Sequence, residues 1–72
     1  MPIKTGDTVC FTAAVIRNCG HDAEIANRRG HVVEIHDRLA RVLWDGESLA
    51  KLVPAANLAK IDRSGAVLDP TF

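Results

Sequence analysis

The amino-acid sequence predicts a small, mainly β protein in which five short strands wrap into a barrel, with a short helical insertion after the first strand. The chain has 72 residues, of which 47% are hydrophobic and 25% charged. This composition suits one compact domain and is too apolar for an intrinsically disordered chain. Apolar and polar residues alternate through residues 31–53, which is the period of half-buried strands. Closure into a barrel would hide the edges of such short strands.

The first strand is expected at residues 8–12, where β-branched and aromatic residues follow a Gly-Asp turn pair. Thr12 can then cap a helix that ends at Gly20, a residue suited to a left-handed helix stop. Asp22 can cap a second helix that ends at two arginines, as the helix dipole favours. The helical insertion therefore covers about residues 12–29.

Three further strands form a predicted meander, at residues 31–36, 39–44 and 48–53. Two residues separate the first pair of strands, the length of a tight hairpin, and an Asp-Gly turn signal separates the second pair. Strict alternation in the first of these strands would place Val33 and Ile35 on one side and Val32 on the other.

Proline cannot donate to a β-ladder, so residues 54–57 are expected to form one tight helical turn before a last strand at residues 58–61. Residues 1–62 make up the single predicted domain. The remainder, residues 63–72, reads as a loosely held C-terminal tail.

Four segments, residues 6–9, 29–35, 40–46 and 53–58, combine a glycine turn, alternating strands, an Asp-Gly hairpin and a proline-initiated turn. This pattern resembles the Src-homology-3-like small barrels of bacteria. Within that superfamily the chain looks similar in architecture to the barrel of nitrile hydratase β-subunits, to KOW modules and to type II dihydrofolate reductases. The fold hosts many unrelated activities, so the resemblance implies architecture more than function.

Type II dihydrofolate reductases carry Val-Gln-Ile-Tyr just before the proline, in a pore shared by four chains. The corresponding residues here are Ala-Lys-Leu-Val, with Lys51 and Val53 in place of the glutamine and the tyrosine. The side chains that hold folate and nicotinamide are therefore missing from the matching positions. The resemblance implies architecture and tetramerisation, and no catalytic activity or cofactor is expected.

Nine basic and nine acidic residues give a formal net charge of zero. No global field then draws the chain to nucleic acid or anionic lipid, and little repulsion keeps copies apart. The sequence therefore favours a non-catalytic binding or assembly module whose partner is itself or another protein, with a homo-oligomer expected. The alternative is a nucleic-acid-binding accessory protein of KOW type.

The candidate binding surface consists of four arginines and the single tryptophan: Arg17, Arg28, Arg29, Arg41 and Trp44. Arginines beside a barrel can contact phosphates. Three of them also have a purely structural explanation, because Arg28 and Arg29 end a predicted helix and Arg41 can pair across strands with Glu34. The insertion that carries three of these arginines is either a binding surface or a lid over the barrel.

Trp44 has two interpretations, an exposed anchor for a partner or a residue of the barrel core. The chain contains one tryptophan, two phenylalanines and no tyrosine. A small domain needs its few large side chains for stability, so the core interpretation is favoured. The absence of tyrosine also argues against a proline-peptide groove, which uses a row of aromatics.

A metal site is not expected, because Cys19 and His21 form the only closely spaced pair of potential ligands. His31 and His36 would lie on opposite faces of a regular strand. Cys10 and Cys19 are read as thiols that are buried or half-buried.

The N-terminus lacks the apolar run of a secretory signal, and every apolar stretch, such as residues 53–56, is far too short to cross a membrane. The sequence therefore predicts a cytoplasmic protein without a membrane partner.

Overall fold

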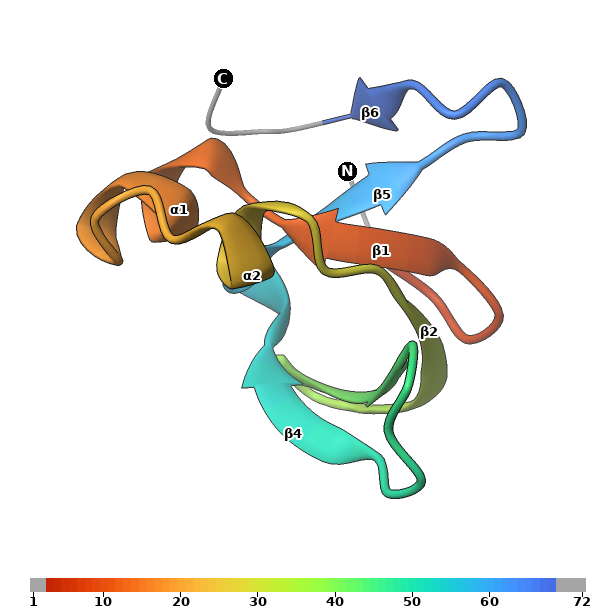
Figure 1. The fold of residues 1–72 in the computed structure, drawn as a ribbon. Coiled ribbons are helices and arrows are strands. Elements are labelled where there is room, and N and C mark those ends of the chain that lie inside the picture. The colour runs from red at the N-terminus through yellow and green to blue at the C-terminus, as the bar shows by residue number, and fades with distance from the viewer. Residues whose placement is uncertain (1–2, 69–72) are drawn as a thin grey trace.

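The computed structural model describes residues 3–68, which form one antiparallel sheet of six strands with two short helices beside it (Figure 1). The strand order is β4-β3-β2-β1-β5-β6. The elements in chain order are β1 (Thr8–Phe11), α1 (Ala13–Asn18), α2 (Ala23–Ala26), β2 (Gly30–His36), β3 (Leu39–Trp44), β4 (Lys51–Pro54), the 3-10 turn η1 (Ala55–Asn57), β5 (Leu58–Ile61) and β6 (Val67–Leu68).

The sheet has six strands rather than the predicted five, and it is not closed into a barrel, since β4 and β6 are its two edges. The sixth strand lies in the predicted tail, where Val67 pairs with Ile61. The turn before it is held by Asp62, whose carboxylate accepts the Ala66 N–H at 3.0 Å. A side-chain acceptor at this position fixes the turn locally, as acidic residues do in tight turns. Residues 69–72 of the predicted tail lie outside the described residues.

Both helices of the insertion begin at the predicted caps. The Thr12 hydroxyl accepts the Val15 N–H at 3.3 Å, and the Asp22 carboxylate accepts the Glu24 N–H at 2.8 Å. Gly20 has a φ of 71° just beyond the first helix, as a left-handed stop requires. The second helix is shorter than predicted because the chain leaves the helical path after Ala26 and enters β2.

A β-bulge overturns the predicted alternation in β2. Val32 is opposite Val42 and Glu34 is opposite Arg41, so Val33 is an extra residue without a partner on β3. Val32 is 1% exposed and Val33 is 44% exposed. The bulge shifts the alternation by one residue, which is why Val33 and Ile35 do not share a side as predicted.

The same bulge corrects the prediction for the two histidines of β2. His31 pairs with Leu43 and His36 pairs with Leu39. The two leucines are four residues apart on β3, so they share a face, and cross-strand partners share it with them. Both histidines therefore lie on the same face of the sheet, near its opposite ends.

The strand predicted at residues 48–53 begins later, at Lys51. The Glu47 N–H donates to the Trp44 carbonyl at 3.0 Å, which closes the turn around Gly46. Ser48 and Leu49 then form a bend, and Ala50 does not join the ladder. Pro54 is the last residue of β4, at the sheet edge where a missing donor is tolerated.

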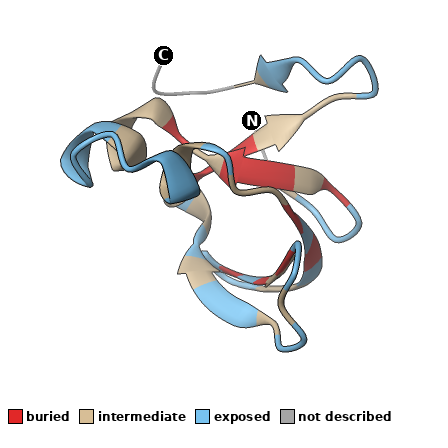
Figure 2. Ribbon diagram, in the orientation of Figure 1, coloured by how far each residue is buried: buried red, intermediate tan, exposed pale blue. Residues whose placement is uncertain are grey.

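The core lies inside the curve of the sheet, where buried residues gather on β1, β2 and β3 (Figure 2). Its fully or almost fully buried members are Val9, Val32, Ala40, Val42, Trp44 and Leu58, with Ile3, Phe11, Ile35 and Val53 packed around them. The helices contribute no buried residue to it, so they cover the sheet without building its centre.

Candidate interaction surfaces

Trp44 belongs to the core, as the aromatic count of the sequence favoured, and it is not an exposed anchor. The residue is 3% exposed, and its indole stacks on the Phe11 ring with centroids 4.6 Å apart. One edge of Trp44 still lines a shallow hollow between α2 and β4. A partner molecule would contact the residues at the rim of this hollow before it contacted the Trp44 indole.

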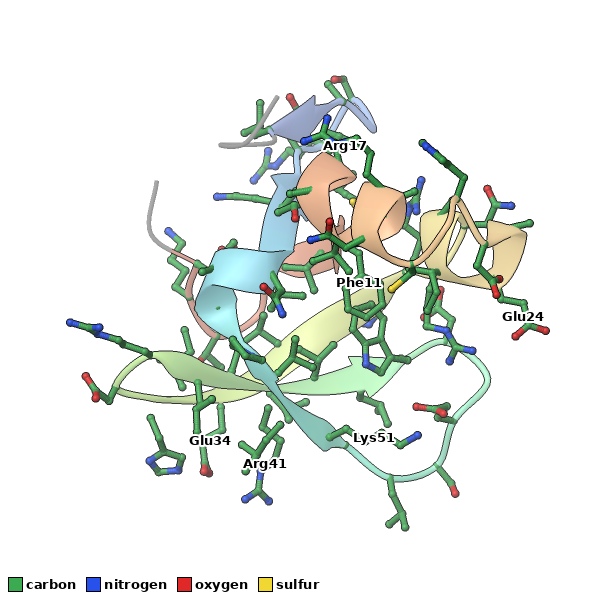
Figure 3. The ribbon with its side chains drawn as sticks, turned by 90° about the vertical axis from the view of Figure 1, so that its left-hand side faces the viewer. Phe11, Arg17, Glu24, Glu34, Arg41 and Lys51 are labelled. Carbon is green, nitrogen blue, oxygen red and sulfur yellow. The ribbon has the colours of Figure 1, made fainter. Side chains whose placement is uncertain are left out.

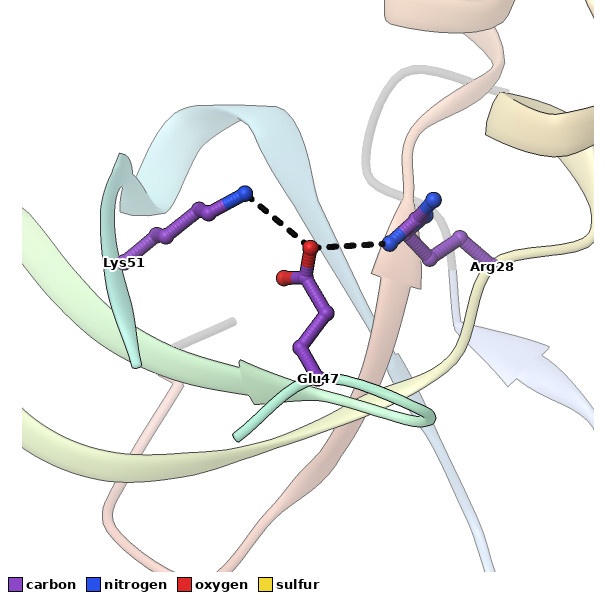
Figure 4. A network of polar contacts seen from close by, with 3 residues as sticks. All are labelled: Arg28, Glu47 and Lys51. Carbon is purple, nitrogen blue, oxygen red and sulfur yellow. Dashed lines mark hydrogen bonds and ion pairs between the residues drawn. The ribbon is translucent and has the colours of Figure 1, made fainter. Parts of the chain in front are cut away.

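The rim carries three charged side chains, Arg28, Glu47 and Lys51, of which Glu47 contacts the other two (Figure 4). Glu47 Oε2 lies 3.6 Å from Arg28 Nη1 and 3.0 Å from Lys51 Nζ. The other carboxylate oxygen, Oε1, is buried and has no hydrogen-bond partner among residues 3–68. Arg28 is thus engaged in holding the loop after β3 against the end of the insertion.

Arg29, the next candidate, contacts the end of α2 and lines a cavity. Its Nη1 donates to the Arg28 carbonyl at 3.0 Å and to the Ala26 carbonyl at 3.4 Å, so it satisfies the carbonyl end of the second helix as a cation at that position can. It also lines a cavity of about 400 Å³ whose other walls come from β1, α1, α2 and β6.

The remaining two arginines lie on opposite sides of the molecule (Figure 3). Arg17 is exposed on the last turn of α1, whereas Arg41 is exposed on the far side of the sheet. The structure therefore does not bring the four arginines together into one patch. It distributes them over the helical insertion, the hollow beside β4 and the outer side of the sheet.

Arg41 belongs to a continuous surface that we call the outer sheet face, the side of β2, β3 and β4 that points away from the core. Figure 3 shows Glu34 and Arg41 on this side, opposite Phe11. Arg41 lies between Glu34 and Leu52 in the register. The members of the face are His31, Val33, Glu34, His36, Leu39, Arg41, Leu43, Leu52 and Pro54.

The outer sheet face carries three large apolar side chains that are exposed. Leu52 is 55% exposed, Val33 44% and Leu39 41%. Leu39 is two residues from Arg41 on the same strand and is opposite Pro54 on β4, so these apolar side chains form neighbouring rows. Glu34 pairs with His36 on its own strand and leaves the Arg41 guanidinium without an ion pair among residues 3–68.

Sequence reasoning missed Leu39, Leu52 and Glu47. The two leucines could have been found by extending the alternation of β3 and β4 outward from Arg41, because residues of one face repeat every second position. Leu52 needs in addition the register between the strands, which residue spacing alone did not fix. Glu47 is four residues from Lys51, but that spacing indicates an ion pair only on a helix. Its other partner, Arg28, lies in the insertion, far away in the sequence.

The cysteines and histidines do not converge on a metal site within residues 3–68, where no three potential ligands lie together. Neither cysteine forms a disulfide within the described residues. Cys10 is buried, as expected, but Cys19 is exposed, because it caps the C-terminal end of a helix that has no buried residue.

Comparisons with family models, curated proteins and solved structures found no match to this chain. No helix within the described part of the chain is long and apolar enough to cross a membrane. What is established is a small antiparallel β protein, and its surfaces provide the basis for a functional proposal.

Proposed function

We propose that this protein is a non-catalytic assembly module that pairs with a second copy of itself through the outer sheet face. The observation that carries the proposal is the exposure of Val33, Leu39 and Leu52 on one continuous side of three strands. Contiguous exposed apolar surface on a small protein marks an interaction site, whereas singly scattered apolar residues do not.

A second copy is the occupant that suits the charges of this face. Glu34 and Arg41 are directly opposite each other across the two strands at the centre of the face. In a two-fold dimer the same patch meets itself, so the acid of one copy can face the arginine of the other. The formal net charge of zero adds no repulsion between copies.

The test measures the mass of the purified full chain by light scattering after size exclusion, over a wide concentration range. We expect a dimer that dissociates on dilution. Leu52→Glu, which buries a carboxylate at the proposed interface, should give a monomer. Leu49→Glu is the matched control, because Leu49 is 76% exposed in the loop before β4, outside the outer sheet face.

A monomer at all concentrations, or equal loss of the dimer in both leucine variants, would contradict the proposal. The resemblance to Src-homology-3-like barrels also suggests an alternative function, a KOW-type nucleic-acid-binding role. To distinguish the two, the mass measurement is repeated with a short single-stranded oligonucleotide. Binding that weakens steeply with salt would favour that role. The four candidate arginines do not form one basic patch, which favours the assembly module over nucleic-acid binding.

A further inference from the structure

The helical insertion and the sheet border an open, mainly apolar cavity of about 400 Å³ that the proposed assembly surface does not use. β1 lines it with Cys10 and Phe11, and α1 lines it with Ala13 and Ile16. The last two are three residues apart and share one face of the helix. Ala13 and Cys10 are small, so the space between these elements is left open rather than filled.

The other walls come from segments distant in the sequence. Ala26 ends α2, Val67 begins β6, and Arg29 lies just before β2. Arg29 is the one charged side chain among the described residues that line the cavity. The volume falls near the lower end of the range for small-molecule sites, roughly 300–1,000 Å³, and a mainly apolar wall with one polar group is the usual composition of such sites.

The Arg29 guanidinium has donors to spare. Its Nη1 is used by two backbone carbonyls, but within residues 3–68 no carboxylate lies within ion-pair distance of it, and its Nε and Nη2 groups have no protein partner there. A guanidinium presents five donors in a planar fork that matches a carboxylate. The two backbone bonds also fix the side chain in place, which reduces the entropy lost on binding.

We propose that this cavity binds a small organic monocarboxylate with an aliphatic tail, the carboxylate on Arg29 and the tail among Cys10, Ile16 and Ala26. The guanidinium selects the charge of the ligand and the apolar walls select its tail. The proposal is independent of the outer sheet face, which lies on the other side of the sheet.

The experiment titrates the isotope-labelled full chain with octanoate and follows the backbone amides by NMR. Two probes with the same tail, 1-octanol and octylamine, separate the contribution of the carboxylate from that of the apolar walls. We expect saturable binding of octanoate with the largest shifts at Phe11, Ile16 and Ala26. Binding of 1-octanol should be about tenfold weaker, because its single neutral oxygen cannot form the paired, charge-assisted hydrogen bonds that a carboxylate accepts from a guanidinium. Octylamine should not bind measurably, because its ammonium group is repelled by the guanidinium.

Two variants test the two halves of the site. Arg29→Met keeps an unbranched apolar stem and removes the charge. The variant should therefore bind octanoate no more tightly than it binds 1-octanol. Ala26→Met adds volume at the cavity wall without changing the charge, and it should weaken both ligands. Arg17→Met is the matched control on the neighbouring helix, outside the lining, and should bind octanoate as the unmodified protein does.

Equal affinity for octanoate and 1-octanol in the unmodified protein would overturn the proposal, as would shifts that map to the outer sheet face. The proposal would also be wrong if Arg17→Met and Arg29→Met weakened octanoate binding equally, because the loss would then come from the overall charge of the insertion. Because Arg29 also holds the end of the second helix, the amide spectrum of each variant is compared with that of the unmodified protein. Ala26→Met keeps Arg29 intact, so it tests the cavity even if Arg29→Met unfolds the insertion.

Discussion

The Phe11 ring lies on the Trp44 indole, with the ring centroids 4.6 Å apart and the planes inclined by 24°. The two residues belong to β1 and β3, which are separated by β2 in the sheet. The stack is possible because the residue between them on β2 is Gly30, which pairs with Val9 on one side and Trp44 on the other. Without a side chain on Gly30, the indole can cross the middle strand and reach Phe11.

Gly30→Ala should therefore destabilise the fold through steric overlap. A Cβ at this position would lie 2.8 Å from Val42 Cγ1 and 2.9 Å from both the Leu43 carbonyl oxygen and Trp44 Cε3. Overpacking of this kind costs about 1–3 kcal/mol. We expect a lower urea midpoint together with a changed fluorescence spectrum of the single tryptophan.

Gly46→Ala is the comparison for that change. Gly46 has a φ of 87°, and a Cβ added there would meet no atom within 4 Å, so alanine costs about 1 kcal/mol of backbone strain and leaves the environment of Trp44 unaltered. If Gly30→Ala kept both the stability and the emission of the unmodified protein, the close approach of Trp44 to β2 would be wrong.

Phe11→Ala should be among the most damaging substitutions of β1. Phe11 packs against the core from the side of the open hollow, and its removal deletes the stack on Trp44. Loss of a phenylalanine side chain costs about 3 kcal/mol or more. The emission of the folded state should also move to longer wavelength, because water gains access to the indole. Leu49→Ala, at a residue 76% exposed, should change the free energy of unfolding by less than about 0.5 kcal/mol.

The β-bulge gives two neighbouring valines opposite roles. Val32→Ala should lower the free energy of unfolding by about 2 kcal/mol, since the residue is 1% exposed in the core. Val33→Ala should cost less than about 0.5 kcal/mol at a low protein concentration where the chain is monomeric. Urea denaturation of the two variants side by side checks this, and equal costs would contradict the register shift between Val32 and Glu34.

The sequence predicted local features well because they depend on neighbouring residues. Thr12 and Asp22 cap their helices through bonds that span only two or three positions. The hairpin between β2 and β3 follows from two alternating runs with two residues between them. Such features need no knowledge of the rest of the chain.

Long-range features were harder, for physical reasons visible in particular residues. The bulge at Val33 arises from the fit of β2 against β3 and the core, and nothing in the local alternation marks it. The sixth strand is only Val67 and Leu68, too short for a periodic pattern. The arginines were grouped because they looked alike in sequence, whereas each partner, such as Glu47 for Arg28, is set by the folded chain.

The β5–β6 hairpin should respond to acid through one carboxylate. The Ser64 hydroxyl donates to Asp62 Oδ1 at 2.6 Å, and the Ala66 and Ser64 N–H groups donate to the same oxygen. These hydrogen bonds, that of the Ser64 side chain first, hold the pKa of Asp62 below its ordinary value of 3.8. Because the pKa is lower in the folded chain, the stabilisation is present above the unfolded pKa and is lost as the pH falls through the folded one.

Ser64→Ala removes the largest of these contributions, so the pKa of Asp62 should rise toward 3.8, while the backbone hydrogen bonds of Ala66, Ser64 and Gly65 keep it from reaching that value. A carbon-detected NMR titration of the Asp62 carboxylate measures the change, and the amides of Val67 and Leu68 report the hairpin in the same samples. Ser48→Ala, an exposed serine in the loop before β4, should leave the titration of Asp62 unchanged. An unaltered pKa in Ser64→Ala would mean that the backbone donors alone hold the turn, and the loss of the β6 pairing in acid would then be independent of Ser64.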